Sequence, residues 1–274
     1  MERLPVSSTA LALLLAAAIG CSGSDGELAG PSTLVVGPSG GDYASIQQAI
    51  DAATSGGTIL VRPGVYTEWL DVSKSLVIVG SGPATVVEYP ANGPADSAVI
   101  TAHDVSGLRI ESLSVRAAQP DVDGIRLRDA TSVVLRGILA AGNTQDGLDV
   151  RRSSGIEIVT GTFEDNLGDG IQVDEGSNSV AIVSSRAARN GGDGVKITLS
   201  GGVLVQDSVA TQNGDDGILV RDSNRVELRR NSSTANAGWG VSVNNSPDTV
   251  LDGNTVVGNG AGDLKCEPDP CSGG

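Results

Sequence analysis

The chain has 274 residues, a formal net charge of −15, and an aromatic content limited to one Phe, two Trp and three Tyr. Phosphate groups repel so acidic a surface, which excludes nucleic acid as a partner and argues against peripheral binding to anionic lipid. Globular cores normally use aromatic rings to fill volume, so we expect this Gly-rich chain to stack thin layers of aliphatic side chains.

The first 20 residues are typical of a signal peptide. An apolar run, Leu11–Ile19, follows a short polar start and is too short to span a bilayer as a stable helix. The run ends in Ala18-Ile19-Gly20-Cys21, which resembles the lipobox of bacterial lipoproteins, although Ala18 stands where that family usually has Leu. An ordinary signal peptide that is cleaved near a cysteine is the alternative.

The lipoprotein resemblance implies a cellular location and a domain organisation for the chain. Residues 1–20 would be removed, Cys21 would carry the lipid, and residues 21–32, rich in Gly, Ser and Pro, would form a flexible tether. Residues 33–274 remain as one domain. We expect a secreted protein that is anchored to the bacterial envelope at the outer membrane, with the lipid as its only membrane contact.

Residues 45–53 predict a short amphipathic helix. Ser45 and Gln48 have the spacing of a capping box, and Gly56 and Gly57 end the segment. The apolar residues on one helical face are Ile46, Ala49, Ile50 and Ala53. Because a stack of layers exposes its core at both ends, we expect this helix to cover the N-terminal end.

A repeat of 22–24 residues occupies the second half of the chain. Its most regular markers are Gly124, Gly147, Gly170, Gly194, Gly217, Gly240 and Gly262. An alternating apolar strand follows each of the first six, and an asparagine stands four residues before most of them, as Asn143, Asn166 and Asn190 do. Glycine in this place indicates either a positive φ or a close approach between backbones.

Units of this length, built from short strands with period two, favour a single-stranded parallel β-helix. A propeller blade is longer, and a leucine-rich repeat has a Leu and Asn pattern that is missing here. Three short strands per turn would stack like residues about 4.8 Å apart, and the asparagines would form a hydrogen-bonded ladder. Looser copies upstream, which begin near Thr58, bring the expected total to about ten rungs.

Two segments resemble the opening of pectin-lyase-like β-helix proteins. They are Gly41–Ala53 and Val61–Glu68, and the repeated Asn-x-x-Asp-Gly-Ile pattern is similar to the β-helix repeat of bacterial surface proteins. The resemblance covers nearly all of the mature chain and implies an all-β, right-handed parallel β-helix. It implies no single activity, because the scaffold hosts lyases, hydrolases, esterases and epimerases, whose motifs are mostly missing here.

Outward-facing charges after the repeat glycines form the candidate catalytic cluster. Its members are Arg126, Asp149, Arg151, Asp174 and Lys196. In uronate lyases and epimerases a base removes a proton beside a carboxylate while cations neutralise the developing charge, and this cluster holds both types of group. Ion pairing between neighbouring rungs is the structural alternative, and it is favoured.

A column of aspartates stands just before the repeat glycines. It consists of Asp123, Asp146, Asp169, Asp193 and Asp216, and Trp239 ends it. Like charges about 4.8 Å apart repel, so we expect turn amides to donate hydrogen bonds to each carboxylate. A Ca²⁺ ion shared between rungs is the second explanation, and no metal or other cofactor is assigned.

The remaining marked residues are two tryptophans and two cysteines. Trp239 and Trp69 are candidates for stacking on sugar rings, with Trp239 favoured because it replaces an aspartate at a turn. In an oxidising compartment Cys266 and Cys271 most simply form a disulfide that protects the last rung.

The sequence therefore predicts a monomeric surface lipoprotein that binds polysaccharide or an envelope glycan. The missing catalytic motifs favour binding without turnover. A lyase or epimerase that acts on an acidic glycan is the first alternative, and a structural or adhesive rod is the second.

Overall fold

The computed structural model describes residues 32–94 and 96–268. The expected signal peptide, Cys21, most of the expected tether and Cys271 lie outside these residues. The described residues contain no helix that is long and apolar enough to cross a bilayer.

Twenty-eight strands and one helix build the described part, and the strands form three parallel sheets. The ten-stranded sheet contains β1 (Thr33–Val36), β2 (Gly57–Val61), β5 (Leu76–Val79), β8 (Arg109–Glu111), β11 (Thr131–Arg136), β14 (Ser154–Val159), β17 (Asn178–Val183), β20 (Gly201–Gln206), β23 (Glu227–Arg229) and β26 (Val250–Asp252). A nine-stranded sheet, called the site sheet below, contains β4 (Leu70–Val72), β7 (Ser97–His103), β10 (Val122–Arg128), β13 (Leu148–Arg151), β16 (Ile171–Asp174), β19 (Val195–Thr198), β22 (Ile218–Arg221), β25 (Trp239–Asn244) and β28 (Gly262–Glu267). The other nine-stranded sheet contains β3 (Gly64–Thr67), β6 (Thr85–Glu88), β9 (Ser114–Arg116), β12 (Leu139–Ala141), β15 (Thr162–Glu164), β18 (Arg186–Ala188), β21 (Val209–Thr211), β24 (Ser232–Thr234) and β27 (Thr255–Val257).

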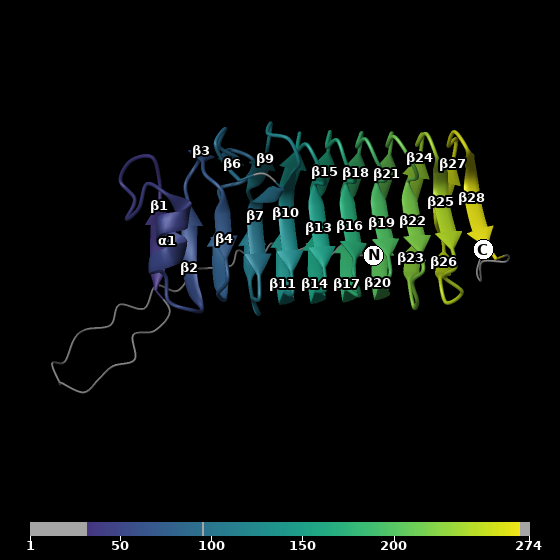
Figure 1. Ribbon diagram of the computed structural model, residues 1–274, viewed down its shortest axis with the longest axis horizontal. Coiled ribbons are helices and arrows are strands. Elements are labelled where there is room, and N and C mark those ends of the chain that lie inside the picture. The colour runs from purple at the N-terminus through teal and green to yellow at the C-terminus, as the bar shows by residue number, and fades with distance from the viewer. Residues whose placement is uncertain (1–31, 95, 269–274) are drawn as a thin grey trace, which may run out of the picture. The chain divides into compact units, whose positions relative to one another are not determined.

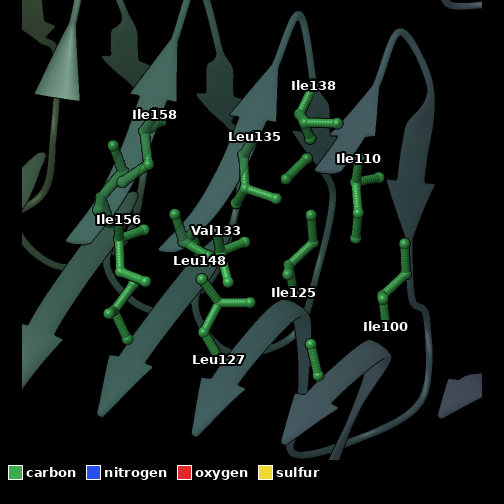
Figure 2. Packing of buried hydrophobic residues seen from close by; sticks show 14 of the residues in the cluster. Ile100, Ile110, Ile125, Leu127, Val133, Leu135, Ile138, Leu148, Ile156 and Ile158 are labelled. Carbon is green, nitrogen blue, oxygen red and sulfur yellow. The ribbon is translucent and has the colours of Figure 1, made fainter. Parts of the chain in front are cut away.

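Each turn of the chain contributes one strand to each sheet, as the stacked arrows of Figure 1 show. This confirms the parallel β-helix and its expected number of rungs. Inward-facing aliphatic residues lie in register from rung to rung: Leu135 pairs with Ile110 on one side and with Ile158 on the other. Figure 2 shows these three side chains on successive rungs, pointing into the interior. All three are fully buried.

The asparagine ladder is also confirmed. Nδ2 of Asn166 donates to Oδ1 of Asn190 at 2.9 Å, and Nδ2 of Asn190 donates to Oδ1 of Asn213 at 3.0 Å. Each side chain is at most 2% exposed. The ladder thus satisfies polar groups inside a turn where water cannot reach them.

The repeat glycines serve close approach and not a positive φ. Gly147 and Gly170 have no positive φ, but a Cβ at Gly147 would lie 2.6 Å from the carbonyl oxygen of Gly170. Gly262 does not belong to this column. Trp239 pairs with Gly262 and Val241 pairs with Leu264, so Asp263 follows Gly240 in the column. Asn259, four residues before Asp263, takes the next place in the ladder and accepts from Nδ2 of Asn236.

Helix α1 (Ile46–Ala52) contacts β1, β2 and β4, the first strands of the coil, with Ile46, Ala49 and Ile50 buried. Oγ of Ser45 accepts from the backbone N–H of Gln48, as expected. The second capping partner is Glu68, whose carboxylate accepts from the backbone N–H groups of Ile46 and Gln47 at 2.8 and 3.1 Å. Carboxylates at helix N-termini are favourable because the N–H groups there lack partners within the helix.

The C-terminal end has no such cover among the described residues. Leu264 and Val257 are 48% and 55% exposed, and an apolar cavity of about 290 Å³ opens beside Val241 and Leu251. Cys266 is disulfide-bonded, and the pairing expected with Cys271 lies outside the described residues.

Candidate functional site

The aspartate column is held by backbone amides, as expected. Oδ1 of each aspartate accepts the N–H of the residue one rung further on, so that Asp146 donates to Asp123 at 3.0 Å and Asp169 donates to Asp146 at 2.7 Å. The same bond recurs at Asp193, at Asp216 and finally at Trp239. One carboxylate oxygen per rung is therefore used to hold the turn.

Burial still disfavours the charged form of these carboxylates. It raises the pKa of Asp123 to about 6, against the opposing effect of the Arg126 guanidinium. Burial and the carboxylates of Asp169 and Asp123 raise the pKa of Asp146 to about 7. At neutral pH the column thus carries less charge than its sequence suggests.

Arg126 and Arg151 both contact Asp149, which lies beneath them with no exposed surface. Nε of Arg151 donates to Oδ1 of Asp149 at 2.9 Å and lies 2.7 Å from Oδ2, which accepts no hydrogen bond from the described residues. Nε of Arg126 lies 3.5 Å from Oδ2 of Asp149 and donates to Asp123 at 2.9 Å. Asp149 lies on the outward-facing column, as expected, but Arg126 on the preceding rung and Arg151 on the same strand cover it.

Lys196 completes the same column, because Arg126, Asp149, Gln172 and Lys196 lie in register on β10, β13, β16 and β19. Its Nζ donates to Oδ2 of Asp169 at 3.0 Å. Burial acts to lower the pKa of Lys196, but nearby carboxylates, Asp169 first, outweigh it and raise that pKa above its ordinary value. Lys196 is therefore a cation at neutral pH.

These groups surround a pocket of about 380 Å³ on the outer face of the site sheet. Its lining residues are Asp96, Asp123, Arg126, Gln145, Asp146, Arg151, Gly168, Asp169, Gln172 and Lys196. The volume falls in the range of small-molecule sites. Gly168 is required here, because a Cβ would overlap Oδ1 of Asp146.

The pocket lacks one residue of the expected cluster and contains others that the cluster did not include. Arg126, Arg151 and Lys196 line it and Asp149 supports it, but Asp174 does not line it and instead accepts the N–H of Glu175. Asp123, Asp146 and Asp169 belong to the aspartate column, and Gln172 belongs to the outward-facing column beside it. Both columns are visible in the sequence, so the contribution of these residues follows from placing the two columns side by side. Asp96 has no such signal, because it comes from the irregular segment between β6 and β7 and reaches Arg126 at 3.3 Å.

Neither tryptophan lines the pocket. The ring of Trp239 packs against Gly262 of the last rung, where a Cβ would overlap it. Trp69 is 43% exposed, and its ring centroid lies 6.5 Å from that of Tyr89. The hydroxyl of Tyr89 donates to the carbonyl of Pro94, which places Trp69 beside the segment that leads to Asp96.

Among residues 32–94 and 96–268, three carboxylates gather closely enough to share a cation. Oxygens of Asp193, Asp215 and Asp216 lie within 4.8 Å of one another. Two of these carboxylates already accept turn amides, and none of the three lines the pocket. We therefore assign no metal to the site.

Comparison with known proteins agrees with this architecture. A family described as "right handed beta helix region" matches residues 124–266, more than half of the chain. The search of curated proteins finds no match.

Three solved structures illustrate the likeness. The mannuronan C-5 epimerase AlgE4 A-module from Azotobacter vinelandii is 18% identical, with a TM-score of 0.61 over 80% of this chain and 74% of that one. Pectate lyase Pel9A is 15% identical, with a TM-score of 0.68 over 88% of this chain and 79% of that one. The enzymatically active domain of bacteriophage CBA120 tailspike protein 2 is 13% identical, with a TM-score of 0.62 over 83% of this chain and 44% of that one.

At these identities the likeness concerns the fold alone, a right-handed parallel β-helix of the pectin-lyase-like type, which polysaccharide lyases and epimerases share. The family match, the three parallel sheets and the in-register columns lead to the same assignment. The chain belongs to the right-handed β-helix family.

Proposed function

We propose that the protein is a surface lipoprotein that binds polysaccharide through the pocket on the site sheet. The observation that carries this proposal is the pocket itself: amide, carboxylate and cationic groups converge on it from four successive rungs. Such groups match the donors and acceptors of sugar hydroxyls. Two structural neighbours that are named for pectate and mannuronan support a glycan as the ligand class.

The state of the cations argues against Arg126, Arg151 or Lys196 as the base of a lyase or epimerase. A general base must be able to accept a proton near the working pH. Lys196 is protonated and paired with Asp169, and Arg126 and Arg151 are held by Asp149. A lyase or epimerase remains the alternative function, because cations and carboxylates do meet in one pocket. Formation of unsaturated or epimerised uronate by the purified protein would favour it.

The N-terminal sequence supports the proposed location. Residues 1–20 and Cys21 have the pattern of a lipoprotein signal, and a polysaccharide-binding domain on a short tether suits the cell envelope. Mass spectrometry of the protein from bacterial membranes tests this directly. A diacylated or triacylated Cys21 at the mature N-terminus is expected, and an unmodified N-terminus would contradict the anchor.

Filling the pocket is expected to weaken glycan binding strongly. Gln172 is half-buried and lines the pocket, and Gln172→Trp would place an indole where the sugar is proposed to sit. We expect affinity for a bound oligosaccharide, measured by isothermal titration calorimetry, to fall at least about tenfold. The matched control is Gln206→Trp, since Gln206 is also half-buried but lies on β20 of another sheet. Equal binding by both variants would refute the pocket as the site. If the native protein bound no polysaccharide, the structural or adhesive rod would be the remaining function.

A further inference from the structure

The pocket has an excess of carboxyl groups over cations. Asp96, Asp123, Asp146 and Asp169 line it together with three cations, and Asp149 adds a carboxyl group beneath. Each cation is already neutralised inside the protein: Arg126 by Asp123 and Asp149, Arg151 by Asp149, and Lys196 by Asp169. No cation is left over for an anionic ligand.

Asp146 is the carboxyl group without a counter-ion. Its Oδ1 accepts the N–H of Asp169, but among the described residues no Lys, Arg or His forms an ion pair with it. It is 9% exposed, and the surface that remains faces the pocket. Burial raises its pKa to about 7, as expected for a carboxylate whose charge is poorly compensated. A cation that enters the pocket would supply the missing partner.

The rest of the molecule opposes an acidic ligand. The chain carries a net charge of −15, so a polyuronate would approach against a repulsive field. Gln145 and Gln172, by contrast, offer neutral donors and acceptors beside Asp146 that suit sugar hydroxyls.

We propose that the pocket selects sugars that carry a protonated amino group, with the Asp146 carboxylate as the counter-ion. This inference rests on the proposed polysaccharide-binding function and specifies its ligand class. The ammonium group would form a charge-assisted hydrogen bond with the free oxygen of Asp146, while the amide side chains contact the ring hydroxyls. The ligand is then an amino-sugar polymer with free amines, and not a uronate polymer.

Four oligosaccharides of equal length and linkage test the inference: β-1,4-linked hexamers of glucosamine, N-acetylglucosamine, glucose and a uronic acid. Their affinities for the full chain are measured by calorimetry at physiological salt, with and without Ca²⁺. We expect the glucosamine hexamer to bind at least about tenfold more tightly than the glucose hexamer, and the uronate to bind weakest. Affinity for the neutral hexamers equal to that for the glucosamine hexamer, or tight uronate binding with Ca²⁺, would overturn the inference and leave polysaccharide binding intact. Failure of all four hexamers would count against the proposed function as well.

A charge-matched pair of variants separates the pocket from general attraction to an acidic protein. Asp146→Asn keeps the Oδ1 acceptor for Asp169 and removes the charge, so it is expected to erase the preference for glucosamine. Glu157→Gln removes the same charge from an exposed position on β14, in the ten-stranded sheet, and is expected to leave the preference unchanged. Equal loss in both variants would show that the attraction is non-specific and would overturn the role of Asp146.

Discussion

Replacing Asn190 by leucine is expected to destabilise the protein by about 3–5 kcal/mol. Oδ1 of Asn190 accepts from the backbone N–H and from Nδ2 of Asn166, and its own Nδ2 donates to the carbonyl of Phe163. Leucine has a similar size but makes none of these bonds. The groups left unpaired are buried, and each costs roughly 1–3 kcal/mol when it loses its partner. Urea denaturation followed by circular dichroism measures the loss.

The control for this substitution is Asn178→Leu on β17. Asn178 is exposed and takes no part in the ladder, so its replacement is expected to change stability by no more than about 0.5 kcal/mol. A loss at position 190 as small as that at position 178 would mean that the ladder does not hold the rungs together.

Stability is expected to rise as the pH falls from about 8 towards 4. The pKa values of Asp123, Asp146 and Asp193 are raised to about 6, 7 and 7, chiefly by burial, while an unfolded aspartate has a pKa near 3.8. Between those values the folded state binds more protons than the unfolded state, so raising the pH through this window favours unfolding. Each unit of difference corresponds to about 1.4 kcal/mol, so the combined effect is of the order of several kcal/mol.

Asp193→Asn isolates this effect in one residue. Asparagine keeps the acceptor for the N–H of Asp216, and its new amide N–H points among the carboxylates of Asp215 and Asp216. We expect the variant to gain roughly 1–3 kcal/mol at pH 8, no advantage at pH 4, and a flatter dependence between them. Glu157→Gln serves as the exposed control. A variant that is less stable than the native protein at pH 8 would show that the carboxylate is needed in its charged form.

The repeat made most of the fold predictable. Because side chains alternate strictly along each strand, the positions after Gly124 to Gly240 indicate the inward columns, the outward columns and the ladder. Only in the last rung was the predicted column wrong, because Asp263, and not Gly262, occupies the position next to Gly240. The conformation of the repeat glycines was open, because a close approach depends on the carbonyl one rung away.

The site was only partly predictable, for two physical reasons. Facing outward does not mean being exposed: Asp149 lies on the outer face, but Arg126 and Arg151 cover it from adjacent positions. In addition, Asp96 belongs to an irregular segment, whose path the periodicity does not determine. Trp239 shows the same limit, since the sequence does not reveal that its ring packs on Gly262 of the last rung.

A crystal structure of the protein with a bound glucosamine oligosaccharide tests the central claim most directly. The expected result is one sugar ring in the pocket, with its ammonium group within hydrogen-bond distance of Asp146 and its hydroxyls against Gln172. A sugar bound elsewhere, for instance on Trp69, with the pocket left to water alone, would contradict the account.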